Sequence, residues 1–214
     1  MYVGRIVSVA RTVDGRLCAA YRVSSRSFPN RSAVVGKDKV SIVPKPGHES
    51  DVMKNPYIAY NCVRIVRDGD VAVVTNGSQT DVIAEKIENG MPIRDAVVLS
   101  SLMLDYEKDA YNTPRISAVV DKDTGAGWLG VVRHDGLQVE RISLEFGRVY
   151  YVATYEENTV CGARCVEFPV QSAEEACDFI LGKDVFAERE NPVTAVAAMA
   201  EDYSFNLTAK DAEV

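Results

Sequence analysis

The sequence contains few of the residues and motifs that mark common enzyme classes. Two of its 214 residues are histidine and one is tryptophan. His48 and His134 stand outside any polar cluster, so a Ser-His-Asp or Cys-His triad is not expected. Neither G-x-x-x-x-G-K-S/T nor G-x-G-x-x-G occurs, which removes the usual cradles for nucleoside triphosphates and dinucleotides. Nothing in these patterns points to a cofactor.

The cysteine pattern does not indicate structural cross-links. There are five cysteines, an odd number, in a chain long enough to form its own hydrophobic core. A secreted disulfide framework is therefore not expected. Cys161 and Cys165 form a C-x3-C pair, but no histidine or second close pair completes a zinc site, so we predict no metal.

Long apolar runs are absent as well. No stretch approaches the roughly 18 consecutive apolar residues of a membrane-spanning helix. The opening residues MYVGRIVSVAR alternate apolar and polar side chains and include Arg5, which is typical of neither a signal peptide nor a membrane anchor. We therefore expect a cytoplasmic protein.

The charge balance is acidic, with 24 basic and 31 acidic side chains and a formal net charge of −7. This argues against broad binding to nucleic acid or to anionic membranes, which requires a basic surface, but leaves a local anion site open. A content of 47% apolar and 26% charged residues is typical of a soluble globular protein. Since no repeat or linker-like tract divides the chain, we predict a single domain over residues 1–214.

Apolar periodicity and turn signals predict the order of the elements. Alternation predicts strands, Asp-Gly pairs predict hairpin turns, and Ser-x-x-Asp/Glu or Pro signals predict helix starts. The predicted strands are 2–9, 17–23, 40–43, 58–66, 71–74, 116–120, 128–132, 137–142 and 149–154. The predicted helices are 78–90, 92–108, 172–182 and an alanine-rich segment at 192–201.

This order of strands, two helices, strands, two helices predicts the fold class. Each block of strands needs one apolar face covered, and each helical pair offers apolar stripes that can cover it. We predict an α+β protein, a four-layer αββα sandwich with two antiparallel sheets packed face to face and helices outside. The alternative is a single mixed sheet with helices on one side.

The most unusual segment is YRVSSRSFPNR at residues 21–31. Residues 16–37 contain no Asp or Glu but five basic side chains, a concentrated exception in an acidic protein. Guanidinium groups interleaved with hydroxyl and amide donors are suited to binding a phosphate monoester. The alternative is a solvated basic edge strand that resists aggregation.

Two further clusters combine amides and phenols. In NPYIAYNC, residues 55–62, strand alternation places Tyr60 on the face opposite Tyr57 and Asn61. Such tyrosines are often packing residues with a satisfied hydroxyl. In TNGSQTD, Asn76 stands just before a predicted helix, where free N–H groups can receive an anion or can simply form an N-cap.

The last cluster is acidic. Asp105, Glu107 and Asp109 crowd the predicted end of a long helix, where the helix dipole disfavours carboxylates. They are either solvated surface residues or residues retained for a task. Asn112, Thr113 and Arg115 lead from there into the next predicted strand.

Taken together, these motifs resemble the archaeal IMP cyclohydrolase family. YRVSSRSFPNR, NPYIAYNC, NGSQTD and DYEKD with NTPRI follow an MY-x-GR start in this order, and the resemblance extends to about residue 208. It implies closure of 5-formamidoimidazole-4-carboxamide ribotide to inosine monophosphate with loss of water. It also implies a four-layer fold similar to that of N-terminal-nucleophile hydrolases. Because this chain begins Met1-Tyr2, we expect no covalent catalysis by an N-terminal nucleophile.

The resemblance and the chemistry together suggest roles for particular residues. Glu107 is expected to accept a proton from the carboxamide, while Tyr60 and Arg22 hydrogen-bond the formyl oxygen. Asn61 and Asn76 are expected to hold the carboxamide. The residues expected at the 5′-phosphate are Arg26, Ser27, Asn30 and Arg31, with Arg115 as a further candidate.

The expected partner is therefore a small purine ribonucleotide, and the exposed sheet edges of a sandwich favour a homo-oligomer. Two other functions stay open from the residues. One is a non-catalytic sensor that binds a purine nucleotide through the same basic loop. The other is an amide hydrolase of the N-terminal-nucleophile type.

Overall fold

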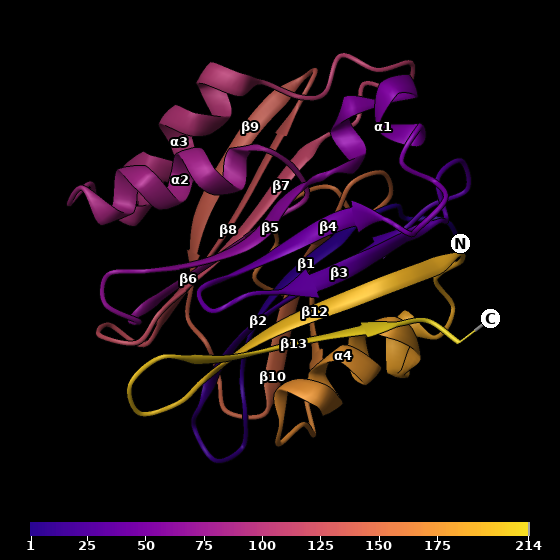
Figure 1. Ribbon diagram of the computed structural model, residues 1–214. Coiled ribbons are helices and arrows are strands. Elements are labelled where there is room, and N and C mark those ends of the chain that lie inside the picture. The colour runs from indigo at the N-terminus through magenta and orange to yellow at the C-terminus, as the bar shows by residue number, and fades with distance from the viewer. Residues whose placement is uncertain (214) are drawn as a thin grey trace.

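Two antiparallel β-sheets form the centre of the protein in a computed structural model, which describes residues 1–213 (Figure 1). The first sheet has the strand order β11-β10-β1-β2-β12-β13, and the second β3-β4-β5-β6-β7-β8-β9. The strands are β1 (Ile6–Arg11), β2 (Leu17–Ser24), β3 (Arg31–Val35), β4 (Lys39–Pro44), β5 (Tyr60–Val66), β6 (Val71–Thr75), β7 (Arg115–Asp121), β8 (Ala126–Arg133), β9 (Gly136–Ile142), β10 (Arg148–Ala153), β11 (Cys165–Glu167), β12 (Pro192–Ala200) and β13 (Phe205–Asp211). The helices are α1 (Asp51–Lys54), α2 (Gln79–Glu88), α3 (Ile93–Leu104) and α4 (Ala173–Gly182), with the 3₁₀ turns η1 (Pro56–Ile58) and η2 (Asp184–Phe186).

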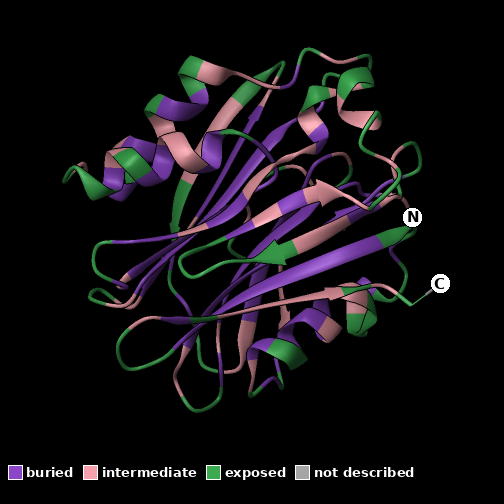
Figure 2. Cartoon of the chain, viewed as in Figure 1, coloured by how far each residue is buried: buried purple, intermediate pink, exposed green. Residues whose placement is uncertain are grey.

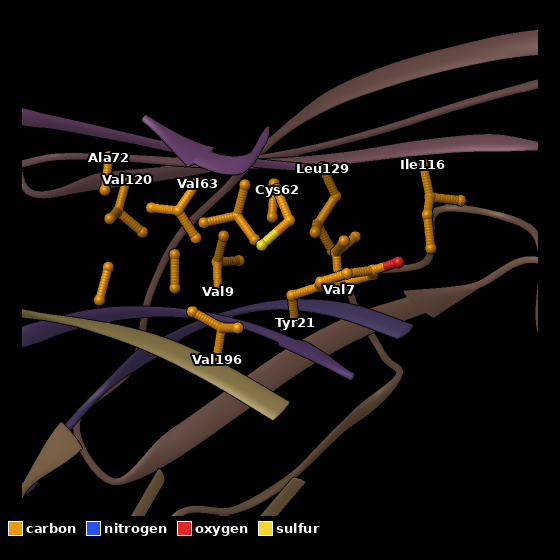
Figure 3. Packing of buried hydrophobic residues seen from close by; sticks show 14 of the residues in the cluster. Val7, Val9, Tyr21, Cys62, Val63, Ala72, Ile116, Val120, Leu129 and Val196 are labelled. Atoms are coloured by element: carbon orange, nitrogen blue, oxygen red, sulfur yellow. The ribbon is translucent and has the colours of Figure 1, made fainter. Parts of the chain in front are cut away.

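Three apolar cores separate four layers. The largest lies between the sheets, where Val7, Tyr21 and Val196 of the first sheet face Val63 and Leu129 of the second (Figure 3). A second core lies between the first sheet and α4, and a third between the second sheet and the pair α2 and α3. The strands are accordingly buried on both faces over much of their length, while the turns are exposed (Figure 2). This confirms the predicted αββα sandwich.

The outer layers are unequal. The predicted helical pair covers the second sheet as α2 and α3, but the first sheet is covered by α4 and the short turn η2 (Figure 1). The prediction of a second helical pair was therefore wrong. No helix within residues 1–213 combines the length and apolar character needed to cross a membrane.

The missing helix is the alanine-rich segment 192–201, which forms strand β12. It lies between β2 and β13, with Val196 and Ala198 facing the inter-sheet core and Ala195 and Ala197 facing α4. Alanine's helix propensity is a weak preference, and burial of both faces of a central strand overrides it. Pro192 is tolerated because the first residue of a strand can lack a ladder N–H.

Some predicted element boundaries also differ from those in the structure. Helix α3 ends at Leu104 rather than Lys108, because Asp105 adopts a left-handed conformation with φ of 55°. Glu107 therefore lies in a loop and not on a helix. Strands β3, β11 and β13 were not predicted, since short or half-exposed edge strands carry little alternation. The three Asp-Gly turns do connect paired strands, as predicted.

The topology brings several strand ends together. Strands β3, β5 and β7 each alternate with an antiparallel neighbour, so their first residues lie at one end of the second sheet. In the first sheet, Ile6, the first residue of β1, pairs with Arg22 near the end of β2, and Ser24, the last residue of β2, pairs with Pro192. The N-terminus and α1 lie at this same end of the sandwich (Figure 1).

The small residues of β12 let α4 pack directly against the first sheet, so a larger side chain there should destabilise the protein. We expect Ala197→Leu to lower the free energy of unfolding by about 1–3 kcal/mol through overpacking. Asn206→Leu, on the exposed face of neighbouring β13, should change it by about 0.5 kcal/mol or less. Urea denaturation of both variants measures the difference. Equal stability of the two would contradict the placement of β12.

Candidate active site

A pocket of about 240 Å³ opens at the end of the sandwich where these strand ends meet. Its wall is formed by the loop after β2, the residues before β1, the junction between α1 and η1, and the loops that follow α3 and β10. Aromatic and hydroxyl groups dominate it. The lining residues are Tyr2, Arg5, Ser25, Arg26, Ser27, Phe28, Asn55, Asp109, Tyr111 and Tyr155.

Buried charges lie at and behind the inner end of this pocket. Arg5, Arg31, Arg115 and Glu107 are each between 1% and 8% exposed. Within residues 1–213, eight buried side-chain nitrogen or oxygen atoms have no hydrogen-bond partner, and five of them belong to these four residues. The five atoms are Arg5 Nε, Arg31 Nη1 and Nη2, Arg115 Nε and Glu107 Oε1. Such groups are normally paired, so their concentration at one place indicates a binding site for a polar ligand.

Arg5 owes its position to the glycine before it. Gly4 has φ of 72°, and a Cβ there would lie 2.1 Å from the Thr154 hydroxyl oxygen. The Arg5 backbone N–H donates to this hydroxyl over 3.1 Å. Burial works against the charge of Arg5, but neighbouring Tyr60, Tyr21 and Glu107 outweigh it and raise its pKa. Because Gly4 has no side chain, the backbone can lie against Thr154, and this contact holds the charged Arg5 directly before β1.

Two phenols lie beside the buried arginines. The hydroxyls of Tyr21 and Tyr60 are 2.6 Å apart, one from each sheet, and Tyr21 projects into the inter-sheet core (Figure 3). Burial raises the pKa of both tyrosines, so each keeps its proton at neutral pH. Arg31, at the start of β3, uses Nε to donate to the Phe28 carbonyl and leaves both terminal nitrogens free of partners in the described chain.

Glu107 is the buried acid of the cluster. Burial raises the pKa of its carboxyl to about 7, although Arg5, Arg115 and Arg31 favour the charged form. Arg115 Nη1 lies 3.7 Å from Glu107 Oε1, too far for a hydrogen bond. A carboxyl with a pKa near neutrality can exchange protons readily, which suits a general base.

The loop that carries Glu107 is held by its own hydrogen bonds. The Glu107 N–H donates to the Thr113 carbonyl over 2.9 Å. The Thr113 hydroxyl lies 2.7 Å from an oxygen of Asp109 and 2.9 Å from the Tyr155 hydroxyl. Asp109 thereby joins the loop to the pocket wall, which keeps the carboxyl of Glu107 in place.

Comparison with known proteins shows the family of this chain. Residues 2–204 match a family model described as "IMP cyclohydrolase-like protein". The chain belongs to the IMP cyclohydrolase-like family. Proteins named IMP cyclohydrolase from Methanosphaera stadtmanae and Methanocella arvoryzae are each 50% identical to it, over 94% and 97% of this chain and 96% of each relative. One from Methanocaldococcus jannaschii is 39% identical over 98% of this chain and 99% of that relative.

Among the candidates from the family motifs, Arg22 lies outside the cluster. It pairs with Ile6 and Ala195, which face α4, so its side chain is on the outer face of the first sheet. Its guanidinium donates to the carbonyls of Ile180, Leu181, Phe186 and Arg189 near the end of α4. The expected contact with a formyl oxygen is therefore not possible from this position. Alternation along β2 directs Tyr21, not Arg22, toward the site.

The two asparagines of the family motifs also serve the scaffold. Asn61 faces α2, where its amide donates to both oxygens of Asp81 over 3.0 Å. Asn76 is fully buried; its oxygen accepts from Ile116 N–H and Gln79 Nε2, and its nitrogen donates to the Pro114 carbonyl. Because both amides are committed to these contacts, the expectation that they hold a carboxamide does not fit the geometry.

The expected phosphate residues do not lie together. Arg26 and Ser27 line the pocket; Arg26 also stacks on the Tyr2 ring at 4.2 Å and pairs with Glu190 at 3.0 Å. Asn30 does not line the pocket. Arg31 lies deeper, beside Tyr60, and Arg115 lies beside Glu107.

Several residues in or behind the pocket were not predicted from the sequence. Arg5 stands in the MY-x-GR start, and its glycine neighbour was the available signal. Tyr21 could have been found from the alternation of β2. Tyr155 and Tyr111 lie in loops with no periodic pattern, so their approach to the pocket depends on tertiary structure alone.

The role of Arg22 can be tested by stability. Arg22→Met leaves several buried carbonyls without donors, and we expect unfolding to become easier by about 3 kcal/mol. This corresponds to a fall in Tm of roughly 6–12 °C for a chain of this size. Arg26→Met, at an exposed position, is the matched control and should leave Tm within about 2 °C. An unchanged Tm for Arg22→Met would restore Arg22 as a candidate for the site.

Proposed function

We propose that this chain is an IMP cyclohydrolase, which closes 5-formamidoimidazole-4-carboxamide ribotide to inosine monophosphate with loss of water. The observation that carries the proposal is the group of unpartnered polar atoms on Arg5, Arg31, Arg115 and Glu107 behind an aromatic pocket. Family membership supports the same reaction. The substrate contains both reacting groups, so the protein has to hold them together, move protons and stabilise charge.

The pocket suggests how the substrate lies. Arg26 and Ser27 at the exposed end supply a guanidinium and a hydroxyl for the 5′-phosphate, which competes with Glu190 for Arg26. The rings of Tyr2 and Tyr155, stacked with centroids 5.8 Å apart, provide apolar area beside the base and ribose. This direction places the formamide and carboxamide toward the inner end, near Arg5 and Glu107.

Glu107 acts as the general base. Its carboxylate accepts a proton from the carboxamide nitrogen as that nitrogen attacks the formyl carbon and the new C–N bond forms. The carboxamide is a weak nucleophile, so proton acceptance in the transition state lowers the barrier. Holding the nitrogen against the formyl carbon contributes up to roughly 7–11 kcal/mol in favourable intramolecular reactions.

Arg31, Arg5 and Tyr60 act on the formyl oxygen. The free N–H groups of the two arginines stabilise the negative charge that develops there, a role first assigned to Arg22. The two hydroxyls are 2.6 Å apart, and either can be the donor; in the proposed mechanism Tyr21 donates to the Tyr60 oxygen, which leaves the Tyr60 proton directed at the substrate. That proton passes to the oxygen and converts it to a hydroxyl. As the C–O bond breaks, Glu107 gives the hydroxyl the proton that it took from the carboxamide, so the oxygen leaves as water. The formamido nitrogen returns its proton to the Tyr60 phenolate as the C–N double bond forms.

The remaining expectations stay predictions. We propose that residues 1–214 act as one domain, because the inter-sheet core takes residues from both ends of the chain. We also propose a cytoplasmic location, as expected for purine biosynthesis, and a homo-oligomer formed through exposed sheet edges.

The direct test is turnover. The purified protein, mixed with the formamido ribotide, should produce inosine monophosphate, followed by ultraviolet absorbance and confirmed by chromatography. Tight binding of inosine monophosphate without turnover would instead support the nucleotide sensor. Release of a carboxylate from a simple amide substrate, with no ring closure, would support the amide hydrolase.

The proposed roles predict distinct kinetics. Because Glu107 must be deprotonated, kcat/KM should fall about tenfold per pH unit below its pKa of about 7 and level off above it. Glu107→Gln should lower kcat by about 10²–10⁴ and abolish this acid limb. Tyr60→Phe should lower kcat by about 10²–10³.

Arg26→Ala is the contrasting variant. It removes a contact proposed for the phosphate and should raise KM by about 10–100-fold with kcat little changed. Steady-state kinetics over pH 5–9 measures all three variants. If Arg26→Ala lowers kcat while Glu107→Gln raises KM alone, the role assignments are reversed.

A further inference from the structure

Gln79, the first residue of α2, contacts none of the pocket yet touches the charged pair behind it. Its side-chain oxygen accepts a hydrogen bond from Arg115 Nη1 over 2.8 Å, and the same Nη1 is 3.7 Å from Glu107 Oε1. The guanidinium therefore faces two acceptors and bonds the neutral one. We propose that Gln79 is a positioning residue that holds Arg115 off Glu107 and so keeps the Glu107 carboxylate free to accept a proton from the substrate.

The oxygen of Gln79 is held in place by a rigid set of contacts. Gln79 is 1% exposed, and its Nε2 donates to Asn76 Oδ1 over 2.9 Å and to the Ile116 carbonyl over 3.3 Å. Asn76 Oδ1 also accepts from the Ile116 N–H. Since Nε2 can only donate, these two acceptors fix which way the amide of Gln79 points. Its oxygen therefore always faces Arg115.

Gly77 shows how tightly this arrangement is built. A Cβ at Gly77 would lie 2.6 Å from Arg115 Nη1, 2.7 Å from Gln79 Oε1 and 3.4 Å from Glu107 Oε1. The absence of a side chain lets the three groups meet over the turn before α2. The NGSQ motif is therefore explained by the space that Gly77 leaves for these groups. It is not explained by helix capping, because the side chain of Ser78 makes no capping hydrogen bond.

A neutral acceptor has a specific electrostatic consequence. If Arg115 bonded Glu107 directly, the ion pair would favour the carboxylate and make it a weaker base. The other charged groups that face Glu107 are Arg5, Arg31 and Asp109, of which the two arginines also favour the carboxylate. Burial and Arg5 also act on the Glu107 carboxyl, but among the described residues only Arg115 lies within ion-pair distance of it, so a shorter contact to Arg115 would make the carboxylate a weaker base.

The inference rests on the proposed function for its meaning, but its test needs no turnover. The protein is labelled with ¹³C at the Glu side-chain carboxyls, and the Glu107 signal is assigned by its loss in Glu107→Gln. Its NMR titration is then followed in Gln79→Leu, which removes the acceptor, and in Gln79→Glu, which makes it anionic. We expect the first to lower the pKa of Glu107 by about one pH unit, a tenfold change in proton affinity, and the second to raise it.

Arg115→Met supplies the control. If Gln79 acts through Arg115, adding Gln79→Leu to Arg115→Met should leave the pKa of Glu107 unchanged. A shift of the same size in both backgrounds, or no shift in either Gln79 variant, overturns the proposal. If Gln79→Leu fails to fold, as judged by circular dichroism, Gln79→Glu is measured with and without Arg115→Met; a larger upward shift when Arg115 is present supports the proposal, and an equal shift or none overturns it.

The titration tests the role of Gln79, and the turnover assay tests the proposed function, so a negative result in one does not decide the other. A protein that closes no ring but shows the predicted shifts loses the proposed function and keeps the Gln79 contact. In an active enzyme, the acid limb of kcat/KM should move with the NMR pKa in each variant, whereas a merely structural role would lower activity without moving it.

Discussion

The site depends on burying three guanidinium groups beside one carboxylate at the end of the inter-sheet core. Desolvation of these charges costs free energy that a single carboxylate does not repay, and several of their N–H groups have no partner in the described chain. The surrounding apolar layers, which bury both faces of the central strands, stabilise the arrangement. The donors are thus in place before charge develops on a substrate, which is how electrostatic preorganisation lowers a barrier.

The fold supplies this convergence through the first residues of its strands. Arg31, Tyr60 and Arg115 begin β3, β5 and β7, and Arg5 directly precedes β1. A residue at the start of a strand lies at the rim of its sheet, where a polar side chain can reach the site and not only the apolar core between the sheets. Antiparallel alternation then brings these starts to one end of the two sheets, although they are far apart in the sequence.

Arg22 and Arg31 are buried to a similar extent but differ in their hydrogen bonding. Arg22 has its hydrogen bonds filled by carbonyls near the end of α4, where cations and N–H donors satisfy the last turn of a helix. Arg31 has both terminal nitrogens free of partners among residues 1–213. Residue type and burial do not distinguish these arginines. The arginine that stabilises the fold has hydrogen-bond partners within the protein, whereas Arg31, which we assign to chemistry, lacks them at both terminal nitrogens.

The sequence by itself determined the layer architecture, most strands and three helices, because alternation, Asp-Gly turns and helix-start signals are local. It also pointed to Glu107, Tyr60 and the basic segment that contains Arg26 and Arg31. Tertiary structure decided the rest. It made segment 192–200 a strand by burying both of its faces, and it turned Arg22 and Asn61 toward helices. Which face of a strand meets the site is fixed by the packing of distant elements, and no short motif encodes that.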